Sequence, residues 1–292
     1  MKPPAFDYAA PGSLDEALAL LAAKRDGAKL LAGGQSFVPA LNFRLARPEL
    51  IIDLNRVPGL AGIRRDGDGG LLIGAMTRAR AIERSEVVAR SNPLLHSAIP
   101  WIAHVPIRNR GTIGGSLAHA DPAAELPAIA LACDAILVAT GILGKRDIAA
   151  RDFFLGVFTT ALRAGEILTE IRFPAWPPNR RHGFAEFARR HGDFAIVGVA
   201  ATIDVAADGA VGDARIVVFG AGDTPRRARE AEAALAGSHP DTGALQRAAA
   251  LAANHVDPPS DHHASAEYRR ELAGTLTRRV LEQALAPRAR AA

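Results

Sequence analysis

The sequence predicts an α+β fold in two domains. Strands and helices alternate up to Ala175, residues 176–181 have the composition of a linker, and three strands followed by three helices lie beyond it. A chain of 292 residues with 49% hydrophobic content is long enough to bury such cores. We therefore expect an N-terminal domain at 1–177, with subdomains of about 1–57 and 58–177, and a C-terminal domain at 180–287.

The first subdomain is predicted to contain one helix and two buried strands. Ser13 and Glu16 have the spacing of a capping box, and apolar residues at helical spacing follow. These features predict a helix over 14–24. Short apolar runs predict strands at 29–32 and 50–54.

The second subdomain begins with a hairpin signal, the Asp-Gly-Asp-Gly run at 66–69. Apolar residues on both sides predict strands at 60–65 and 70–75. Thr77 is expected to cap one helix and Pro93 to begin another. The complete expectation for the rest of this subdomain is helices at 77–84, 93–103 and 123–133 and strands at 135–140 and 146–149.

The C-terminal domain is predicted to be a three-stranded antiparallel sheet covered by three helices. Asp208-Gly209 marks one hairpin turn. Thr224 and Pro225 have the order expected of an N-cap and a first helical residue. The expected strands are 184–189, 194–206 and 214–219, and the expected helices are 225–236, 241–254 and 266–286.

Two glycine pairs are the most informative local feature. Gly33-Gly34 and Gly114-Gly115 each end a short apolar run, and a serine follows each pair. Glycine lets the backbone turn and lets a ligand approach it, so that amide groups converge on phosphate oxygens. Either pair alone is more often an ordinary turn, but the repetition favours two halves of one anion site.

Other nucleotide and catalytic motifs are missing from the sequence. Neither glycine pair fits a Walker loop, and Gly220-Ala221-Gly222 lacks the third glycine of a dinucleotide fingerprint. The sequence contains no recognisable nucleophile, triad or acid–base carboxylate pair, and its nine histidines form no spaced ligand set. We therefore expect no catalytic and no metal-binding residues in this chain.

The composition limits the partners. A single cysteine, Cys133, holds neither a disulfide nor an iron–sulfur cluster, so any such cluster belongs to another chain. The net charge is +4 and the basic residues are scattered, which argues against nucleic-acid binding. The sequence has no membrane-length apolar run and no signal-peptide pattern, so we expect a cytoplasmic protein without a transmembrane segment.

The sequence resembles a known family, the FAD-binding medium subunits of molybdenum hydroxylases. Xanthine dehydrogenase and carbon monoxide dehydrogenase are molybdenum hydroxylases of this kind. The resemblance extends over almost the whole chain. It implies an FAD-binding domain of the vanillyl-alcohol oxidase (PCMH) type. The segments that carry it are 29–36, 44–45, 50–54, 108–122, 152–156, 166–168, 192–195 and 266–270.

The resemblance implies that FAD lies between the two glycine segments, with its diphosphate held by amides of 33–36 and 112–116. Asp121 matches an acidic position near the flavin, although Asp-Pro is equally a loop initiator. Phe194 replaces a family tyrosine beside the isoalloxazine, although it is equally a core residue. Ile113, Leu117 and Leu168 are candidates for apolar contacts. The other implied FAD-binding residues are Lys29, Leu30, Ala32, Gly33, Gly34, Gln35, Ser36, Thr112, Gly114, Gly115 and Ser116.

The same resemblance implies an electron-transfer subunit. A large partner would carry the molybdopterin cofactor and a small partner two [2Fe–2S] clusters, in a dimer of heterotrimers, and electrons would pass through this FAD to an external acceptor. The substrate and the acceptor are not determined by this chain. Two alternatives remain: a stand-alone FAD oxidase of the vanillyl-alcohol oxidase type, and a non-catalytic scaffold subunit that has lost its flavin.

Overall fold

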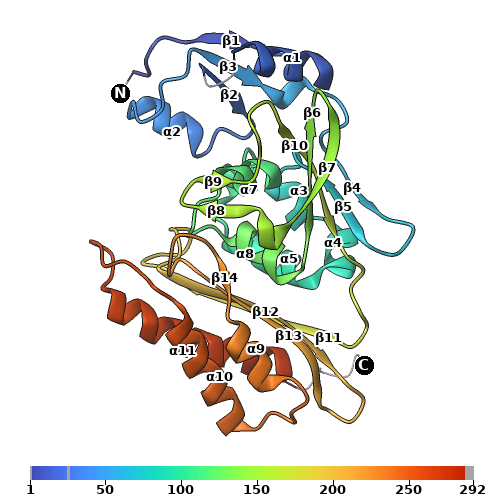
Figure 1. The fold of residues 1–292 in the computed structure, drawn as a ribbon, viewed down its shortest axis with the longest axis vertical. Coiled ribbons are helices and arrows are strands. Elements are labelled where there is room, and N and C mark those ends of the chain that lie inside the picture. Colours follow the sequence, from blue (N-terminus) through green and yellow to red (C-terminus); the bar gives the residue numbers. More distant parts are fainter. Residues whose placement is uncertain (1, 25–26, 287–292) are drawn as a thin grey trace.

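The computed structural model describes residues 2–24 and 27–286, in which three sheets follow one another along the long axis of the molecule (Figure 1). They have three, five and four strands, and a small two-stranded ribbon accompanies the middle sheet. The mixed α+β class predicted from the sequence is confirmed.

The N-terminal sheet is parallel, in the order β1-β3-β2. The expected helix and both strands are present, and the capping box forms: Ser13 Oγ accepts from Glu16 N at 3.1 Å. β1 was not predicted, because it has only three residues and is largely exposed. The elements are β1 (Asp7–Ala9), α1 (Leu14–Lys24), β2 (Ala28–Leu31), α2 (Phe37–Asn42), β3 (Leu50–Asp53) and the 3-10 turn η2 (Leu54–Arg56).

The middle sheet is antiparallel, in the order β4-β5-β10-β6-β7. Its central strand β10 was not predicted. Its strands are β4 (Ile63–Arg65), β5 (Leu71–Gly74), β6 (Ile136–Gly141), β7 (Gly144–Ala149) and β10 (Ile167–Phe173), and the ribbon is β8 (Phe154–Gly156) with β9 (Thr159–Thr160). The helices and 3-10 turns are α3 (Ala79–Glu83), α4 (Glu86–Ser91), α5 (Pro93–Ala98), η3 (Ile99–Trp101), α6 (Val105–Arg108), α7 (Ile113–His119), α8 (Glu125–Ala132) and η4 (Ala150–Asp152).

Two predicted helices of this part differ from the structure. Thr77 does not cap α3, because its hydroxyl donates to Gly62 O at 3.1 Å and accepts from Gly62 N at 2.9 Å. The helix predicted over 93–103 ends at Ala98 and continues as the 3-10 turn η3. Pro100 explains this end, since it has no N–H to continue the α-helical hydrogen bonds.

The C-terminal sheet is an antiparallel meander of three long strands with a two-residue fourth strand at its edge. This fourth strand corrects the prediction: Arg226 and Arg227 pair with β13, so Thr224 caps no helix there and α9 begins later. The expected linker also overlaps the start of β11. The elements are β11 (Arg180–Phe187), β12 (Val197–Val205), β13 (Val211–Phe219), β14 (Arg226–Arg227), α9 (Arg229–Leu235), α10 (Thr242–His255) and α11 (Ala266–Leu285).

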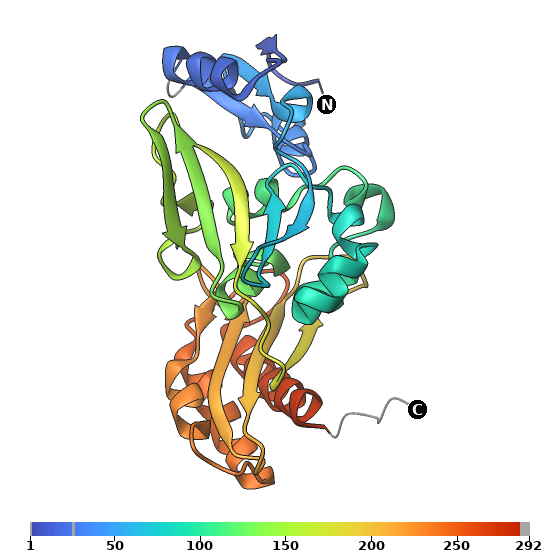
Figure 2. The ribbon, with the colours of Figure 1, turned by 90° about the vertical axis from the view of Figure 1, so that its right-hand side faces the viewer.

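The C-terminal sheet is covered on both faces. Helices α9, α10 and α11 pack on one face, and α8 with α5 packs on the other (Figure 2). All eight residues of α8 are buried, and its Ile129 belongs to the same apolar cluster as Phe184 and Phe219 of the sheet. The Thr202 hydroxyl also donates to Ala132 O at 3.2 Å. The middle and C-terminal parts of the chain therefore share one hydrophobic core.

This shared core makes a stability prediction. Ile129 is fully buried, so Ile129→Ala removes apolar contacts of both parts and should lower the free energy of unfolding by about 2–5 kcal/mol. Urea denaturation followed by circular dichroism measures the change. Val87→Ala on exposed α4 is the control and should cost under about 1 kcal/mol. An Ile129→Ala loss as small as that of the control would contradict a shared core.

Candidate functional site

The first glycine pair forms an open loop between β2 and α2. Gly34 has φ +74°, a conformation that favours glycine. Among the described residues, the five consecutive backbone N–H groups from Gly33 to Phe37 have no protein acceptor, and the loop's one internal side-chain bond runs from Gln35 Nε2 to Gly33 O at 3.1 Å. Free amides in a glycine-containing turn form a concave anion-binding surface. The geometry fits a phosphate group here.

The structure brings the two glycine segments into direct contact. A Cβ on Gly33 would lie 2.4 Å from Arg110 O, and one on Gly115 would lie 3.3 Å from the Ala32 Cβ. Because Gly33 has no side chain, the first loop can contact the backbone that precedes the second segment.

The second glycine pair is not a loop. It lies in the first turn of α7, and Thr112 caps this helix by accepting from Gly115 N at 3.0 Å. The other amides also donate within the chain: Ile113 N to Thr77 O at 3.1 Å, Gly114 N to Ala75 O at 2.8 Å and Ser116 N to Thr112 O at 3.1 Å. The expectation that amides of 113–116 are free for a diphosphate is thus not met. Gly114 is needed for packing, since its Cβ would lie 2.5 Å from that of Ala75.

What the second segment offers is a hydroxyl. The Ser116 side chain is half-buried on α7, and its hydroxyl has no hydrogen-bond partner within the described part of the chain. Ser36, at the end of the first loop, is exposed and makes no side-chain cap. Each segment therefore presents one hydroxyl that a ligand oxygen can use.

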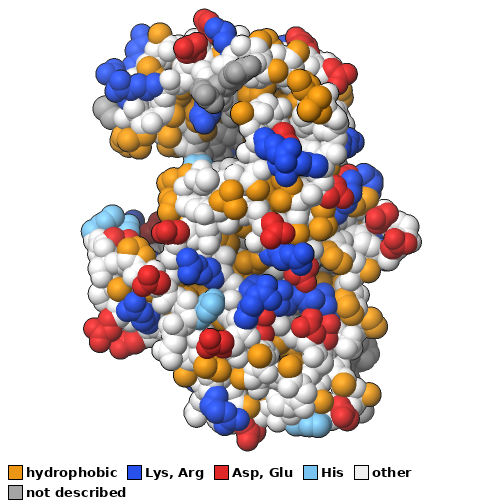
Figure 3. Space-filling view, in the orientation of Figure 1, with side chains coloured by type: hydrophobic (Ala, Val, Ile, Leu, Met, Phe, Trp, Pro, Cys, Tyr) orange, Lys and Arg blue, Asp and Glu red, His pale blue; other side chains and the backbone are white. Residues whose placement is uncertain are grey.

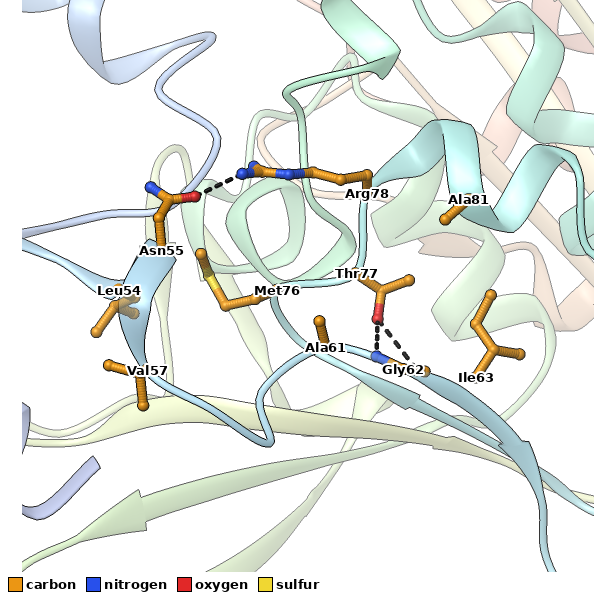
Figure 4. A pocket seen from close by; sticks show the side chains of 10 residues that line it. All are labelled: Leu54, Asn55, Val57, Ala61, Gly62, Ile63, Met76, Thr77, Arg78 and Ala81. Carbon is orange, nitrogen blue, oxygen red and sulfur yellow. Dashed lines mark hydrogen bonds between the residues drawn. The ribbon is translucent and has the colours of Figure 1, made fainter. Parts of the chain in front are cut away.

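Two arginines add positive charge beside the loop. The Arg78 guanidinium donates to Arg110 O and to the Asn55 side-chain oxygen, and Asn55 Nδ2 donates to Ala32 O at 3.0 Å (Figure 4). Burial, followed by the charge of Arg110, lowers the pKa of Arg78. In the described structure neither Arg78 nor Arg110 forms an ion pair. An anion would relieve the repulsion between these two neighbouring cations.

Asp53 lies close to this network but is already occupied. Its carboxylate accepts from Tyr8 Oη at 2.6 Å and from Asn55 N at 2.8 Å. Burial acts to raise its pKa, but these hydrogen bonds and the charge of Arg110 bring it below the ordinary value. Asp53 therefore stays ionised and fixes Asn55. Its charge acts on both arginines, but among the described residues it forms no ion pair with either.

A cavity of about 460 Å³ opens next to the loop, between η2 and the start of α3 (Figure 4). Asn55, Thr77 and Arg78 form its polar edge. The remaining lining is apolar or small and consists of Leu54, Val57, Ala61, Gly62, Ile63, Met76 and Ala81. In the space-filling view a notch separates the N-terminal layer from the rest of the molecule below α2 (Figure 3).

The remaining expected side chains are scattered. Lys29 is exposed on β2 and Leu30 packs against the N-terminal core. Ile113, Leu117 and Leu168 are buried in the core of the middle part, so their side chains do not line the loop. A flavin could touch these three side chains only by reaching into the core, and their contact with it stays a prediction.

Asp121 and Phe194 remain compatible with a ligand contact. Asp121 is half-buried and accepts from Ala123 N at 2.9 Å, as a loop initiator does. Phe194 lies in the loop before β12 and is 61% exposed, so it is neither in the strand nor in the core. This loop packs on the residue that precedes α6: a Cβ on Gly192 would lie 2.5 Å from the His104 ring.

Four residues of the site were not predicted from the sequence as functional residues: Asn55, Arg78, Arg110 and Glu125. The carboxyl of Glu125 is buried at the start of α8, and burial, assisted by Asp121, raises its pKa to about 7. One signal was available: Glu125 opens an otherwise apolar helix. No comparable signal marks the arginines, because isolated arginines usually lie on solvated surfaces.

Within residues 2–24 and 27–286, no group of three or more His, Cys, Asp or Glu side chains is arranged to hold a metal ion. Over the same ranges, no helix has the length and apolarity needed to span a bilayer. Burial raises the pKa of the Cys133 thiol to about 12, so it stays protonated.

Comparisons with known proteins agree with this fold. Residues 4–176 match the family described as FAD binding domain in molybdopterin dehydrogenase, and residues 182–284 match the CO dehydrogenase flavoprotein C-terminal domain. The 6-hydroxypseudooxynicotine dehydrogenase complex subunit alpha of Paenarthrobacter nicotinovorans is 45% identical over 285 residues, 98% of this chain and 96% of the relative.

Solved structures give the same result. A chain of the carbon monoxide dehydrogenase from Hydrogenophaga pseudoflava that lacks the Mo-pyranopterin moiety is 40% identical, with a TM-score of 0.95 over 98% of this chain and 99% of that one. A chain of quinoline 2-oxidoreductase from Pseudomonas putida 86 is 38% identical, with a TM-score of 0.92 over 98% of both.

Fold, site and comparisons together define a flavoprotein subunit of an oxidoreductase. The chain belongs to the family of FAD-binding medium subunits of molybdenum hydroxylases. The resemblance noted from the sequence is confirmed, and neither the stand-alone oxidase nor the scaffold alternative is retained.

The contact between the glycine segments can be tested directly. Gly33→Ala would place a methyl group against the Arg110 carbonyl, and the forced separation should cost about 1–3 kcal/mol of stability. Thermal unfolding measures the loss. Gly67→Ala is the matched control, because a Cβ there meets nothing within 4 Å. Equal melting temperatures for the two variants would contradict the close approach.

Proposed function

We propose that the first glycine loop binds the diphosphate of FAD. The free N–H groups of residues 33–37 would donate to its oxygens, Arg78 and Arg110 would supply positive charge, and the hydroxyls of Ser36 and Ser116 would add donors. The observation that carries this proposal is the run of five amides without a protein acceptor, held open against Arg110. Gly115 lies against Ala32 at the start of this loop, while Thr112 caps α7 and Gly114 packs α7 against Ala75.

The cavity next to the loop is proposed as the place of the adenosine end. It shares Asn55 and Arg78 with the diphosphate site, so a ligand that leaves the loop enters it directly. Its apolar lining suits the faces of a purine, and its polar edge suits a ribose or the ring nitrogens.

The flavin end would then extend toward Asp121 and Phe194. An exposed phenylalanine on a loop packed beside the start of α6 can shield or stack on an aromatic ring. Phenylalanine donates no hydrogen bond, so a polar contact at this end would fall to the carboxyl groups of Asp121 and Glu125. When bound, FAD supplies one- and two-electron redox chemistry that no side chain of this protein provides.

We further propose that the chain works in a cytoplasmic complex. A large partner would hold the molybdopterin cofactor and a small partner two [2Fe–2S] clusters, arranged as a dimer of heterotrimers. Relatives are named medium chains or complex subunits, which supports partner chains. Those relatives belong to complexes named for nicotine derivatives, caffeine and carbon monoxide, so we assign substrate choice to another subunit.

The proposed division of labour follows the predicted domains. Residues 1–177, with subdomains of about 1–57 and 58–177, would bind the ADP part and one wall of the flavin. Residues 180–287 would supply the opposite wall through Phe194. The shared core between α8 and the C-terminal sheet supports a fixed spacing of the two walls.

If the first loop binds the diphosphate, the positive charge of Arg78 should contribute to FAD affinity. Arg78→Gln in the assembled complex should weaken FAD binding roughly 10- to 100-fold, because a charged hydrogen-bond donor is worth about 1.5–3 kcal/mol. Fluorescence titration of the flavin-depleted complex measures the affinity. Arg84→Gln, at the exposed end of α3, is the control and should bind FAD normally. Unchanged FAD affinity in Arg78→Gln, or a purified complex without FAD, would overturn the assignment.

The cavity assignment makes a selectivity prediction. Ala61→Trp should fill the cavity and reduce affinity for FAD much more than for FMN, since FMN has no adenosine. The ratio of the two dissociation constants is the measured quantity. Ala250→Trp on the exposed side of α10 is the matched control. A ratio that is the same in both variants would place the adenosine elsewhere.

A further inference from the structure

Two acidic side chains lie enclosed between the middle part of the chain and the C-terminal sheet. Glu125 is the first residue of α8 and is only 6% exposed. Glu186 lies on β11, two residues after Phe184, and thus projects from the same face, which is packed toward α8 and α5. The charge of Glu125 reaches Glu186 across this packing layer.

Neither carboxyl has a compensating partner. Oε2 of Glu186 is fully enclosed and accepts no hydrogen bond, and neither glutamate takes part in an ion pair within the described residues. For Glu125, the one donor that reaches the carboxyl is its own backbone amide. Two carboxylates elsewhere in the chain differ in this respect: Glu83 pairs with Arg108 at 2.9 Å, and Glu232 pairs with Arg227 at 2.8 Å.

Within the described residues, the other ionisable groups on the surrounding elements do not compensate the charge of either carboxyl. Asp121 adds a further negative charge, and Arg269 is already engaged with Ile196 O, Gly220 O and Asp261. The basic side chains on the elements that pack around this layer, or in the adjoining loops, are His96 on α5, His104 and His119 before α8, Arg189 and His191 after β11, and Arg269 on α11; within the described residues none of them pairs with either glutamate.

Two uncompensated negative charges in this layer would be costly. A buried carboxylate without a partner is strongly disfavoured, and a second one within reach adds repulsion. A proton is the simplest compensation, because it removes one charge without requiring any group that the layer lacks.

We propose that Glu125 and Glu186 act as one carboxyl pair that retains a proton between α8 and the C-terminal sheet at neutral pH. The protons belong to the pair rather than to either residue. Burial raises the pKa of Glu125 to about 7, and burial together with the charge of Glu125 raises that of Glu186 to about 8. Because the folded chain keeps protons that the unfolded chain has lost, its stability falls as the pH rises from about 4.5 through 8.

The pair also bears on the cofactor site. A protonated carboxyl donates a hydrogen bond, which a phenylalanine ring such as that of Phe194 cannot do. The retained proton would thus provide a donor next to Asp121, at the flavin end of the site. This consequence rests on the proposed function, whereas the retained proton itself does not.

Infrared spectroscopy of the assembled complex tests the proposal. At pH 7 ordinary glutamates, with a pKa near 4.3, are ionised, so the carbonyl band of protonated carboxylic acids reports buried acids alone. We expect the wild type to show a component of this band that disappears between about pH 6 and pH 9. Glu186→Gln and Glu125→Gln should each remove the upper part of this titration. Glu186→Asp should restore it.

The controls separate the possible outcomes. Glu267→Gln removes an exposed carboxyl from α11 and should leave the band unchanged. No titrating band in the wild type, or the same band in wild type and Glu186→Gln, would refute the pair. Where a variant does not assemble, a wild type without a titrating band still refutes the pair, and the other Gln variant serves to assign a band that is present. FAD content, read from the visible spectrum, reports on the proposed function separately: a complex without FAD that keeps the band would contradict that function and not the pair.

Discussion

The close approach of Gly33 to the Arg110 carbonyl is the contact on which the rest of the site depends. It joins two segments that are far apart in the sequence, one after a parallel strand and one before a helix. Asn55 and Arg78 hold this junction by donating to the carbonyls of Ala32 and Arg110, and within the described residues the amides of the first loop have no acceptors. Unsatisfied hydrogen-bond donors are thus concentrated at one place, and an anionic ligand that accepts from them would stabilise the folded chain.

Much of the fold was predictable where the local pattern was long. The helix α1 and the three helices of the C-terminal part begin or end within a few residues of their expected positions, because amphipathic spacing is a local property. The strand β10 was missed for the opposite reason. Its Glu170 and Arg172 are charged residues inside a central strand, and they are accommodated by Arg64 and Asp147 from distant parts of the chain. Such partners are visible only after folding.

The site was predictable only in part. The sequence identified both glycine pairs, but it assigned them the same role, whereas Gly114 serves packing against Ala75 and its amide is already used. Arg78 and Arg110 are candidates for binding an anion because, among the described residues, neither has an acidic partner. Glu125 is a candidate for holding a proton because its carboxyl is buried. Neither property can be read from residue type or spacing, since each depends on what the rest of the chain places nearby.

The helix α8 has a mechanical consequence. It is buried on every side, begins a few residues after α7 and supports the C-terminal sheet through one continuous apolar core. Domains joined by a small polar interface move relative to one another, but those joined by an extensive apolar one do not. The middle and C-terminal parts are therefore expected to move as one unit at this helix. A hinge between them would have to open the core around α8, whereas the N-terminal sheet has an apolar cluster of its own.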